Sequence, residues 1–285
     1  MSKIAVITDT DSSLPPDLAE GHAIQQVPIT VHFDGESYTC GVDIDDRRLF
    51  EIVDRTHKLP TTAAPTPDAF SKSYQQAFDL GAESILCFCV SSQMSSTYQS
   101  AMLALESFPG KDIRVVDSQT LSMAQGFIAL TAAETIKQGG TVEEALAQAS
   151  AVGQRLSLYA VLSTLKYLAM SGRVGKVAAG MANTLNIKPI LTVSDGKLVL
   201  LEKVRTQKKA VERMMTLVKG QLGDKPIERA AILHINDYER AVVFQEQLCG
   251  EFGCPIDSTF IAEFTPGLSV HAGSGVVGVV VLRGK

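Results

Sequence analysis

Two runs of hydroxyl side chains have residue types and a spacing that could do chemistry. One is Ser91-Ser92-Gln93-Met94-Ser95-Ser96, and the other is Thr61-Thr62, which lies between prolines ahead of a helix start expected near Pro67. A hydroxyl loop that leads into a helix offers O–H donors, free backbone N–H groups and the positive end of the helix dipole. The two runs therefore predict an anion-binding site, although helix capping is the commoner role of any single serine.

Few basic side chains have a sequence context that suits such a site. Arg173 lies close to two glycines, and Arg205 lies in a basic stretch. His271 is the one histidine of five within a glycine-rich segment, where backbone can approach a ligand closely. A second interpretation uses the same residues as a serine hydrolase or acyltransferase, in which Ser95 or Ser274 is the nucleophile and His271 the base.

Nucleotide-binding, catalytic and metal motifs occur only as fragments. The GxGxxG match at residues 273–278 is followed by a strand-like run, whereas a pyrophosphate site needs a helix there. The phosphate-loop pattern at residues 172–177 is too short, and Val177 replaces the metal-binding hydroxyl. Ser163 and Lys166 fit SxxK, but the partner motifs of that class are missing. The five cysteines show no CxxC spacing, so we expect free thiols and no metal site.

The elements that must position these side chains are strands. Residues 4–8, 85–90 and 113–116 are apolar and β-rich, and each run leads through a polar loop into a helical pattern. Successive strand, loop and helix units predict a parallel sheet covered by helices. Ligands bind outside the carboxyl ends of such strands, which is where the serine run lies.

The pattern changes after about residue 155. Strand-like runs at 189–193 and 198–204 flank Asp195-Gly196, a strong signal for a two-residue hairpin. Thr206 is expected to cap a helix that ends at Gly220. This part of the chain therefore predicts antiparallel pairing mixed with helices.

Length and composition are consistent with this organisation. At about 150 residues per domain, the 285 residues suggest two domains, and 45% hydrophobic residues suffice for a core. We expect an α/β protein with an N-terminal parallel-sheet α/β domain at 1–155, a C-terminal mixed α+β domain with antiparallel strands at 156–285, and a ligand between them. The net charge of −5 offers no general positive field for nucleic acid. No signal peptide or membrane-spanning stretch is recognisable, so we expect a cytoplasmic protein without stable membrane insertion.

Several ordered motifs together carry a resemblance to a known family. The chain resembles the DegV family along almost its whole length, through Ile7-Thr8-Asp9, Ser12-Ser13-Leu14-Pro15, Leu59-Pro60-Thr61-Thr62 with Pro65, the run from Ser91 to Ala101, the run from Ser171 to Lys176, Lys203-Val204-Arg205-Thr206, and His271-Ala272-Gly273-Ser274-Gly275. Several motifs in the same order are much more specific than any one of them.

The resemblance implies a non-catalytic protein of the EDD fold that binds a long-chain fatty acid between two α/β domains. It implies no other cofactor, and it implies a partner, a separate fatty acid kinase that makes the acyl phosphate in bacterial phospholipid metabolism. Transferred to this sequence, the carboxylate contacts fall on Thr62 and Ser95. The residues that would surround the head group or face the partner are Thr61, Ser96, Arg173, Arg205 and His271.

The sequence departs from the family pattern at three places near these motifs. Ala63-Ala64 replaces the usual Ser-Gln, Ser96 replaces a glycine, and Ser274 replaces a proline. Besides the fatty-acid carrier and the hydrolase, a third interpretation is a lipid-sensing regulator whose partner recognises the loaded state. Acyl length, the residues along the tail and the oligomeric state are not predicted by the sequence.

Overall fold

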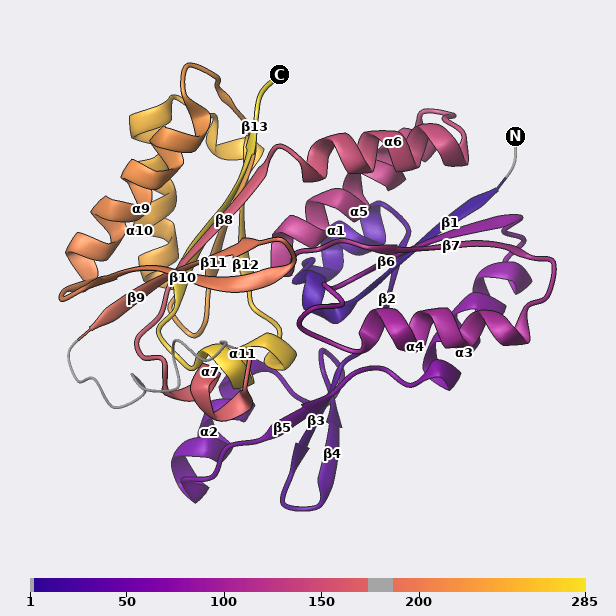
Figure 1. Ribbon diagram of the computed structural model, residues 1–285, viewed down its shortest axis with the longest axis horizontal. Coiled ribbons are helices and arrows are strands. Elements are labelled where there is room, and N and C mark those ends of the chain that lie inside the picture. Colours follow the sequence, from indigo (N-terminus) through magenta and orange to yellow (C-terminus); the bar gives the residue numbers. More distant parts are fainter. Residues whose placement is uncertain (1–2, 174–186) are drawn as a thin grey trace.

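The structure is a computed structural model that describes residues 3–173 and 187–285. Its N-terminal half is built on a parallel sheet in the order β2-β1-β6-β7. The strands are β1 (Ile4–Asp9), β2 (Ile24–Val27), β6 (Ser84–Cys89) and β7 (Asp112–Asp117). Helices α3 (Pro67–Asp79) and α4 (Thr97–Ala104) lie on one side of this sheet, and α1 (Pro16–Gly21) and α5 (Ser122–Lys137) lie on the other (Figure 1). The predicted parallel sheet is confirmed.

Alternation along β6 explains why this strand is apolar after its first residue, Ser84. Ile85 and Cys87 belong to the core under α3 and α4, whereas Leu86 and Phe88 belong to the core under α5. Successive side chains of a strand point to opposite faces, so a sheet covered on both faces needs apolar residues at every position. The helix α6 (Val142–Gly153) packs on α5, and its start has the capping box of Thr141 and Glu144.

The C-terminal half contains a six-stranded sheet in the order β10-β9-β8-β13-β11-β12. Its strands are β8 (Leu156–Val161), β9 (Lys188–Ser194), β10 (Lys197–Val204), β11 (Ile227–His234), β12 (Thr259–Glu263) and β13 (Val277–Arg283). All neighbours pair antiparallel except β11 with β12. Helices α9 (Gln207–Leu222) and α10 (Tyr238–Phe252) cover the outer face, and the inner face turns toward the N-terminal half (Figure 1).

Three local predictions for this half differ in outcome. Asp195 and Gly196 form the β9–β10 turn with φ of 49° and 74°, so the hairpin is confirmed. Thr206 caps α9 as expected, because its side chain accepts a hydrogen bond from the backbone of Lys209. The predicted helix end at Gly220 is wrong. The helix continues to Leu222, and Gly223 with its positive φ follows, since Leu222 still packs in the core.

A third, three-stranded antiparallel sheet was not predicted. It has the order β4-β3-β5 and consists of β3 (Thr30–Phe33), β4 (Glu36–Thr39) and β5 (Thr61–Ala63). Together with α2 (Asp46–Thr56) it lies beside the short helices α7 (Lys166–Ser171) and α11 (Pro266–Ala272) (Figure 1). The remaining elements are the 3-10 helices η1 (Thr10–Ser12), η2 (Leu105–Ser107) and η3 (Ile256–Ser258).

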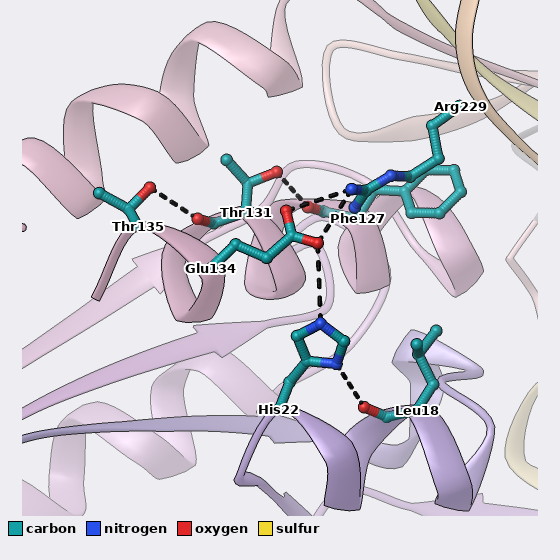
Figure 2. A network of polar contacts seen from close by, with 7 residues as sticks. All are labelled: Leu18, His22, Phe127, Thr131, Glu134, Thr135 and Arg229. Atoms are coloured by element: carbon teal, nitrogen blue, oxygen red, sulfur yellow. Dashed lines mark hydrogen bonds and ion pairs between the residues drawn. The ribbon is translucent and has the colours of Figure 1, made fainter. Parts of the chain in front are cut away.

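Helix α5 joins the two halves, since it packs against β1 and β6 as well as β8 and β13. Glu134 on this helix pairs with Arg229 of β11 at 2.9 Å and with His22 at the end of α1 at 3.7 Å (Figure 2). The Arg229 guanidinium also lies 5.7 Å from the centre of the Phe127 ring. Polar and cation–π contacts therefore reinforce the apolar core shared by both sheets.

None of the helices within residues 3–173 and 187–285 is both long and apolar enough to cross a membrane. Within the same ranges all five cysteines are buried free thiols, as expected.

Candidate functional site

The threonine run and the histidine meet although they lie far apart in the chain. Thr62 is the middle residue of β5, which pairs with β3 at Val31, and His271 lies in the last turn of α11. The Thr62 Oγ1 and the His271 Nε2 are 3.0 Å apart. Thr61 has the opposite orientation along β5 and is exposed, as alternation in a strand requires.

The serine loop follows β6 and is held by its own backbone. The backbone N–H groups of Met94 and Ser95 both donate to the Ser91 carbonyl, at 3.0 and 3.1 Å. The Ser95 Oγ lies 2.8 Å from the Thr97 Oγ1 and accepts a hydrogen bond from the Thr97 backbone at 3.3 Å. Ser95 therefore takes part in capping α4, and its hydroxyl also lines a cavity.

This cavity, which we call the central cavity, lies between the two halves and has a volume of about 430 Å³. Five of the seven residues singled out from the sequence line it: Thr62, Ser95, Ser96, Arg173 and His271. Most of the remaining wall is apolar and comes from both halves of the chain: Ile29, Ala63, Ala64, Pro65, Pro67, Val90, Met94, Leu121, Leu158, Ala160, Leu162, Leu168, Leu191, Leu198, Phe264, Leu268, Ala272 and Val276. The volume and composition are those of a small-molecule site.

Ala63 and Ala64, two of the departures from the family pattern, are part of this wall. Their methyl groups extend its apolar part next to Thr62. Ser274, another departure, is exposed.

The imidazole of His271 is neutral at physiological pH. Burial lowers its pKa to about 4, and the positive charge of Arg173 acts in the same direction. The Nδ1 atom of His271 is buried and has no hydrogen-bond partner among the described residues. A neutral imidazole keeps one donor and one acceptor, so His271 can serve a polar ligand group without adding charge to the cavity.

Asp11 is a cavity residue that the sequence analysis did not single out. It lies in η1, directly after the carboxyl end of β1, and is almost completely buried. Burial and the neighbouring Asp9 raise the pKa of Asp11 well above its ordinary value, and Arg173 opposes that shift. Its Oδ1 has no hydrogen-bond partner among the described residues. The signal in the sequence was the acidic run after the first strand, at the edge where ligands bind.

Asp9 is structural by contrast. Its Oδ1 accepts from the backbone of Asp11 at 2.9 Å, and its Oδ2 accepts from Val90 at 2.8 Å and Gln125 at 3.0 Å. Burial raises the pKa of Asp9 to about 6 although these hydrogen bonds oppose it. These contacts fix the ends of β1 and β6 relative to each other, and with them the start of the serine loop.

A second buried carboxyl supports the helix that carries His271. Asp46, at the start of α2, accepts a 2.7 Å hydrogen bond from the hydroxyl of Ser269 on α11. Burial raises the pKa of Asp46 to about 8, and the hydrogen bond from Ser269 lowers it in part. Asp46 is thus mostly protonated at neutral pH and ties α11 to α2.

Two predicted residues lie outside the central cavity. Thr61 is exposed on β5, and Arg205 is exposed after the end of β10. The end of the predicted motif from Ser171 to Lys176, starting at Val174, lies outside the described residues. Ser163 Oγ donates to the Gly275 carbonyl at 3.2 Å and is not part of the cavity wall that the structure describes.

The hydrolase interpretation needs a serine hydroxyl hydrogen-bonded to His271 and an acid on the other ring nitrogen. The described structure pairs His271 with Thr62 instead, and Ser95 with Thr97. Among the described residues, no carboxylate hydrogen-bonds to the Nδ1 of His271. Residues 3–173 and 187–285 also contain no cluster of three or more metal-ligating side chains.

The chain is similar to known proteins along nearly its whole length. The model of the DegV family, described as uncharacterised proteins, matches residues 3–284. A DegV domain-containing protein of Streptomyces coelicolor is 33% identical over 278 residues, which covers 98% of each chain. Among solved structures, a DegV family protein from Thermus thermophilus described by fatty acid binding has a TM-score of 0.91 at 29% identity and covers 99% of each chain. DegV of Bacillus subtilis, described as a fatty acid binding protein, has a TM-score of 0.89 at 29% identity over the whole of both chains.

Proposed function

Since the chain belongs to the DegV family, we propose that it binds a long-chain fatty acid in the central cavity and catalyses no reaction itself. The carboxylate is held by Thr62 and Ser95, and the tail lies along the apolar wall. The observation that carries the proposal is a largely apolar cavity whose polar residues include two hydroxyls, a neutral imidazole and an arginine. The fatty acid binding described for the relatives from Thermus thermophilus and Bacillus subtilis supports this ligand class.

The tail supplies the affinity. A sixteen-carbon acid has about fourteen methylenes, and full burial at ~0.8 kcal/mol each yields roughly 11 kcal/mol before the cost of association is subtracted. The apolar wall drawn from both sheets is suited to receive such a chain. An acid with a short tail would lose most of this free energy, so the protein is selective for long chains.

The head group determines that the ligand is an acid. A buried carboxylate without partners is severely penalised, so the hydroxyls of Thr62 and Ser95 replace its water, and the charge of Arg173 compensates its negative charge. His271 is neutral, and its Nε2–H can donate to the Thr62 oxygen, which leaves the Thr62 hydroxyl proton for the carboxylate. Burial and Asp9 raise the pKa of Asp11, which favours its neutral form and so weakens the repulsion that a second anion would cause.

We also propose that the loaded protein presents this carboxylate to a separate fatty acid kinase in the bacterial cytoplasm, as a step of phospholipid metabolism. Thr61, Ser96 and Arg205 are exposed and would face this partner. An Arg205→Ala variant should then keep its affinity for palmitate and lose acyl-phosphate formation with the kinase. Loss of palmitate affinity in this variant would contradict the partner-facing role.

The two-domain division at 1–155 and 156–285 is part of the proposal. It is supported by the strands, because the parallel sheet uses residues up to Asp117 and the six-stranded sheet begins at Leu156.

The ligand class is tested by denaturing the purified protein, extracting it with organic solvent and identifying the extract by mass spectrometry. Added palmitate should also bind with measurable affinity by calorimetry. Finding neither a co-purified acyl chain nor uptake of palmitate or oleate would overturn the proposal.

The head-group assignment is tested by comparing the binding of palmitate and of hexadecanol in the wild type and three variants. Thr62→Val and Ser95→Ala should each weaken palmitate binding about 10- to 100-fold, as expected for a hydrogen bond to a charged group, and should change hexadecanol binding much less. Thr61→Val is the matched control, because it makes the same substitution next to Thr62 but outside the cavity. An equal effect of Thr61→Val and Thr62→Val would contradict the assignment.

An ester-hydrolysis assay separates this proposal from the hydrolase. A carrier has no turnover, so the wild-type protein and Ser95→Ala should both be inactive. Turnover in the wild-type protein that disappears in Ser95→Ala would instead establish an enzyme. For a lipid-sensing regulator, the discriminating result is a partner protein that is retained only by the loaded form.

A further inference from the structure

A second cavity adjoins the central cavity, and within the part of the chain that the structure describes the two share one side chain. This side cavity has a volume of about 520 Å³ and lies between the carboxyl end of β7, α5, α6 and the β8–β9 pair. Leu158 of β8 is the residue that lines both cavities. The lining of the side cavity mixes apolar side chains, among them Phe88, Ile128 and Leu146, with hydroxyl, amide and carboxylate groups.

The order of residues along β8 places the two cavities end to end. Alternate residues of a strand share one face, and here Leu156 lines the side cavity, Leu158 lines both, and Ala160 and Leu162 line the central cavity. At ~3.3 Å per residue, the path from Leu158 to Leu162 is roughly 13 Å long. Leu158 therefore stands between the two spaces on a single sheet face.

Neighbouring strands repeat this division. On β9, Leu191 lines the central cavity and Val193 the side cavity. At the end of β6 in the opposite sheet, Val90 lines the central cavity and Phe88 the side cavity. On both sheets, the change from residues of one cavity to residues of the other therefore occurs next to Leu158.

Along the chain, the residues of β8 that line the central cavity come between those that line the side cavity and Arg173. Beyond Leu162 the chain enters α7 and then reaches Arg173, so β8 runs from the side cavity, past Leu158, toward the polar part of the central cavity. A ligand whose carboxylate lies near Arg173 and whose tail follows β8 would direct its terminal methyl group at Leu158.

We propose that Leu158 is the end wall of the acyl site and sets the longest chain that binds, and that the side cavity is an acyl subsite which its side chain closes off. The ligand that this subsite takes is the terminal methylene segment of a longer acyl chain. The inference rests on the proposed fatty-acid function and adds to it the residue that determines chain length.

A simple packing role for Leu158 makes a different prediction. Leu158 and Leu191 are both buried in the same core, at 5% and 2% exposure, and both line the central cavity. If Leu158 only packs, trimming either leucine enlarges the cavity by the same volume and has the same effect. If Leu158 is the end wall, only its truncation connects the two cavities.

The experiment measures Kd by calorimetry for saturated acids from C14 to C24 with delipidated protein. Each additional buried methylene should lower Kd about fourfold, until the tail reaches the end wall and Kd stops falling. In Leu158→Ala, Kd should keep falling to longer chains than it does in the wild type. Acids longer than the chain length at which the wild-type Kd stops falling should bind the variant at least tenfold tighter than the wild type. In Leu191→Ala the limit should stay where it is in the wild type.

Leu158→Val, which removes less volume, is included in case the alanine variant does not fold. It should move the limit in the same direction by a smaller step. A limit that stays in place in both Leu158 variants, or that moves equally in Leu191→Ala, would overturn the inference while leaving the proposed function intact. Failure of the wild-type protein to bind any acid in the series would overturn the proposed function itself.

Discussion

Replacing Asp46 by asparagine should remove a large pH dependence of stability. The carboxyl of Asp46 is 1% exposed, and burial raises its pKa from 3.8 to about 8. The folded protein therefore keeps this proton up to about pH 8, whereas an unfolded chain releases it near pH 4. Unfolding releases a proton between these two values, so the contribution of Asp46 to stability is fully present below about pH 4 and is lost progressively as the pH rises toward 8.

The magnitude follows from the width of this window. Each pH unit between the two pKa values changes the free energy of unfolding by about 1.4 kcal/mol. From pH 5 to pH 8 the carboxyl of the wild type therefore costs roughly 4 kcal/mol of stability, and the amide of Asp46→Asn costs nothing additional over that range. The amide oxygen can still accept the hydrogen bond from Ser269, so the variant keeps the tie between α2 and α11.

The assay is urea denaturation of the wild type and Asp46→Asn at pH 5, 6, 7 and 8. The difference in free energy of unfolding should shift in favour of the variant as the pH rises. Ser269→Ala is the matched variant of opposite sense, because the hydrogen bond that it removes lowers the pKa of Asp46. Its stability should keep falling to a higher pH than that of the wild type. Parallel stability curves for the wild type and Asp46→Asn would refute the argument that Asp46 is protonated in the folded protein.

Two further predictions concern the surroundings of the central cavity. Gly196→Ala should destabilise the protein by roughly 2 to 3 kcal/mol, because φ is +74° there and the new Cβ would lie 2.7 Å from the Ser91 Oγ. That hydroxyl donates to the Gly196 carbonyl at 2.7 Å. Gly35→Ala is the control, because Gly35 also has a positive φ but an added Cβ would meet nothing within 4 Å. This variant should lose only about 1 to 2 kcal/mol of stability through backbone strain. Equal losses of stability in the two variants, measured by denaturant titration, would contradict the clash with Ser91. In Arg173→Gln the pKa of His271 should rise from about 4, because the charge that helps to lower it is removed. An NMR titration of the imidazole that shows no rise would contradict this.

The serine loop was predictable because its position depends on local pattern and on one topological rule. The apolar run before Ser91 predicted a buried strand, and parallel strands end at the same edge of a sheet. The structure has β6 in the centre of a parallel sheet, with the loop at its carboxyl end. The same reasoning applies to β1, because Asp11 lies in the polar run that follows the carboxyl end of that strand.

The contact between Thr62 and His271 could not be predicted from local pattern. The two residues are 209 positions apart. Thr62 lies on a three-residue strand, too short for alternation to be recognised, and His271 lies on a seven-residue helix. Their meeting depends on how α11 packs against β5 and α2, and the tertiary contact of Asp46 with Ser269 is one of the interactions that decides it.

The two halves of the chain contribute different properties to one cavity. The N-terminal half supplies hydroxyl groups, among them Thr62 on the short strand β5 and Ser95 in the loop after β6, and under the proposed function these determine which head group is accepted. The C-terminal half supplies a regular apolar face, on which residues two apart along β8 form a straight wall. Under the proposed function and the role inferred for Leu158, this strand face sets the length of the acyl chain, whereas the hydroxyl groups recognise the head group. On that proposal, selection for an acid and selection for a chain length can change independently in this fold.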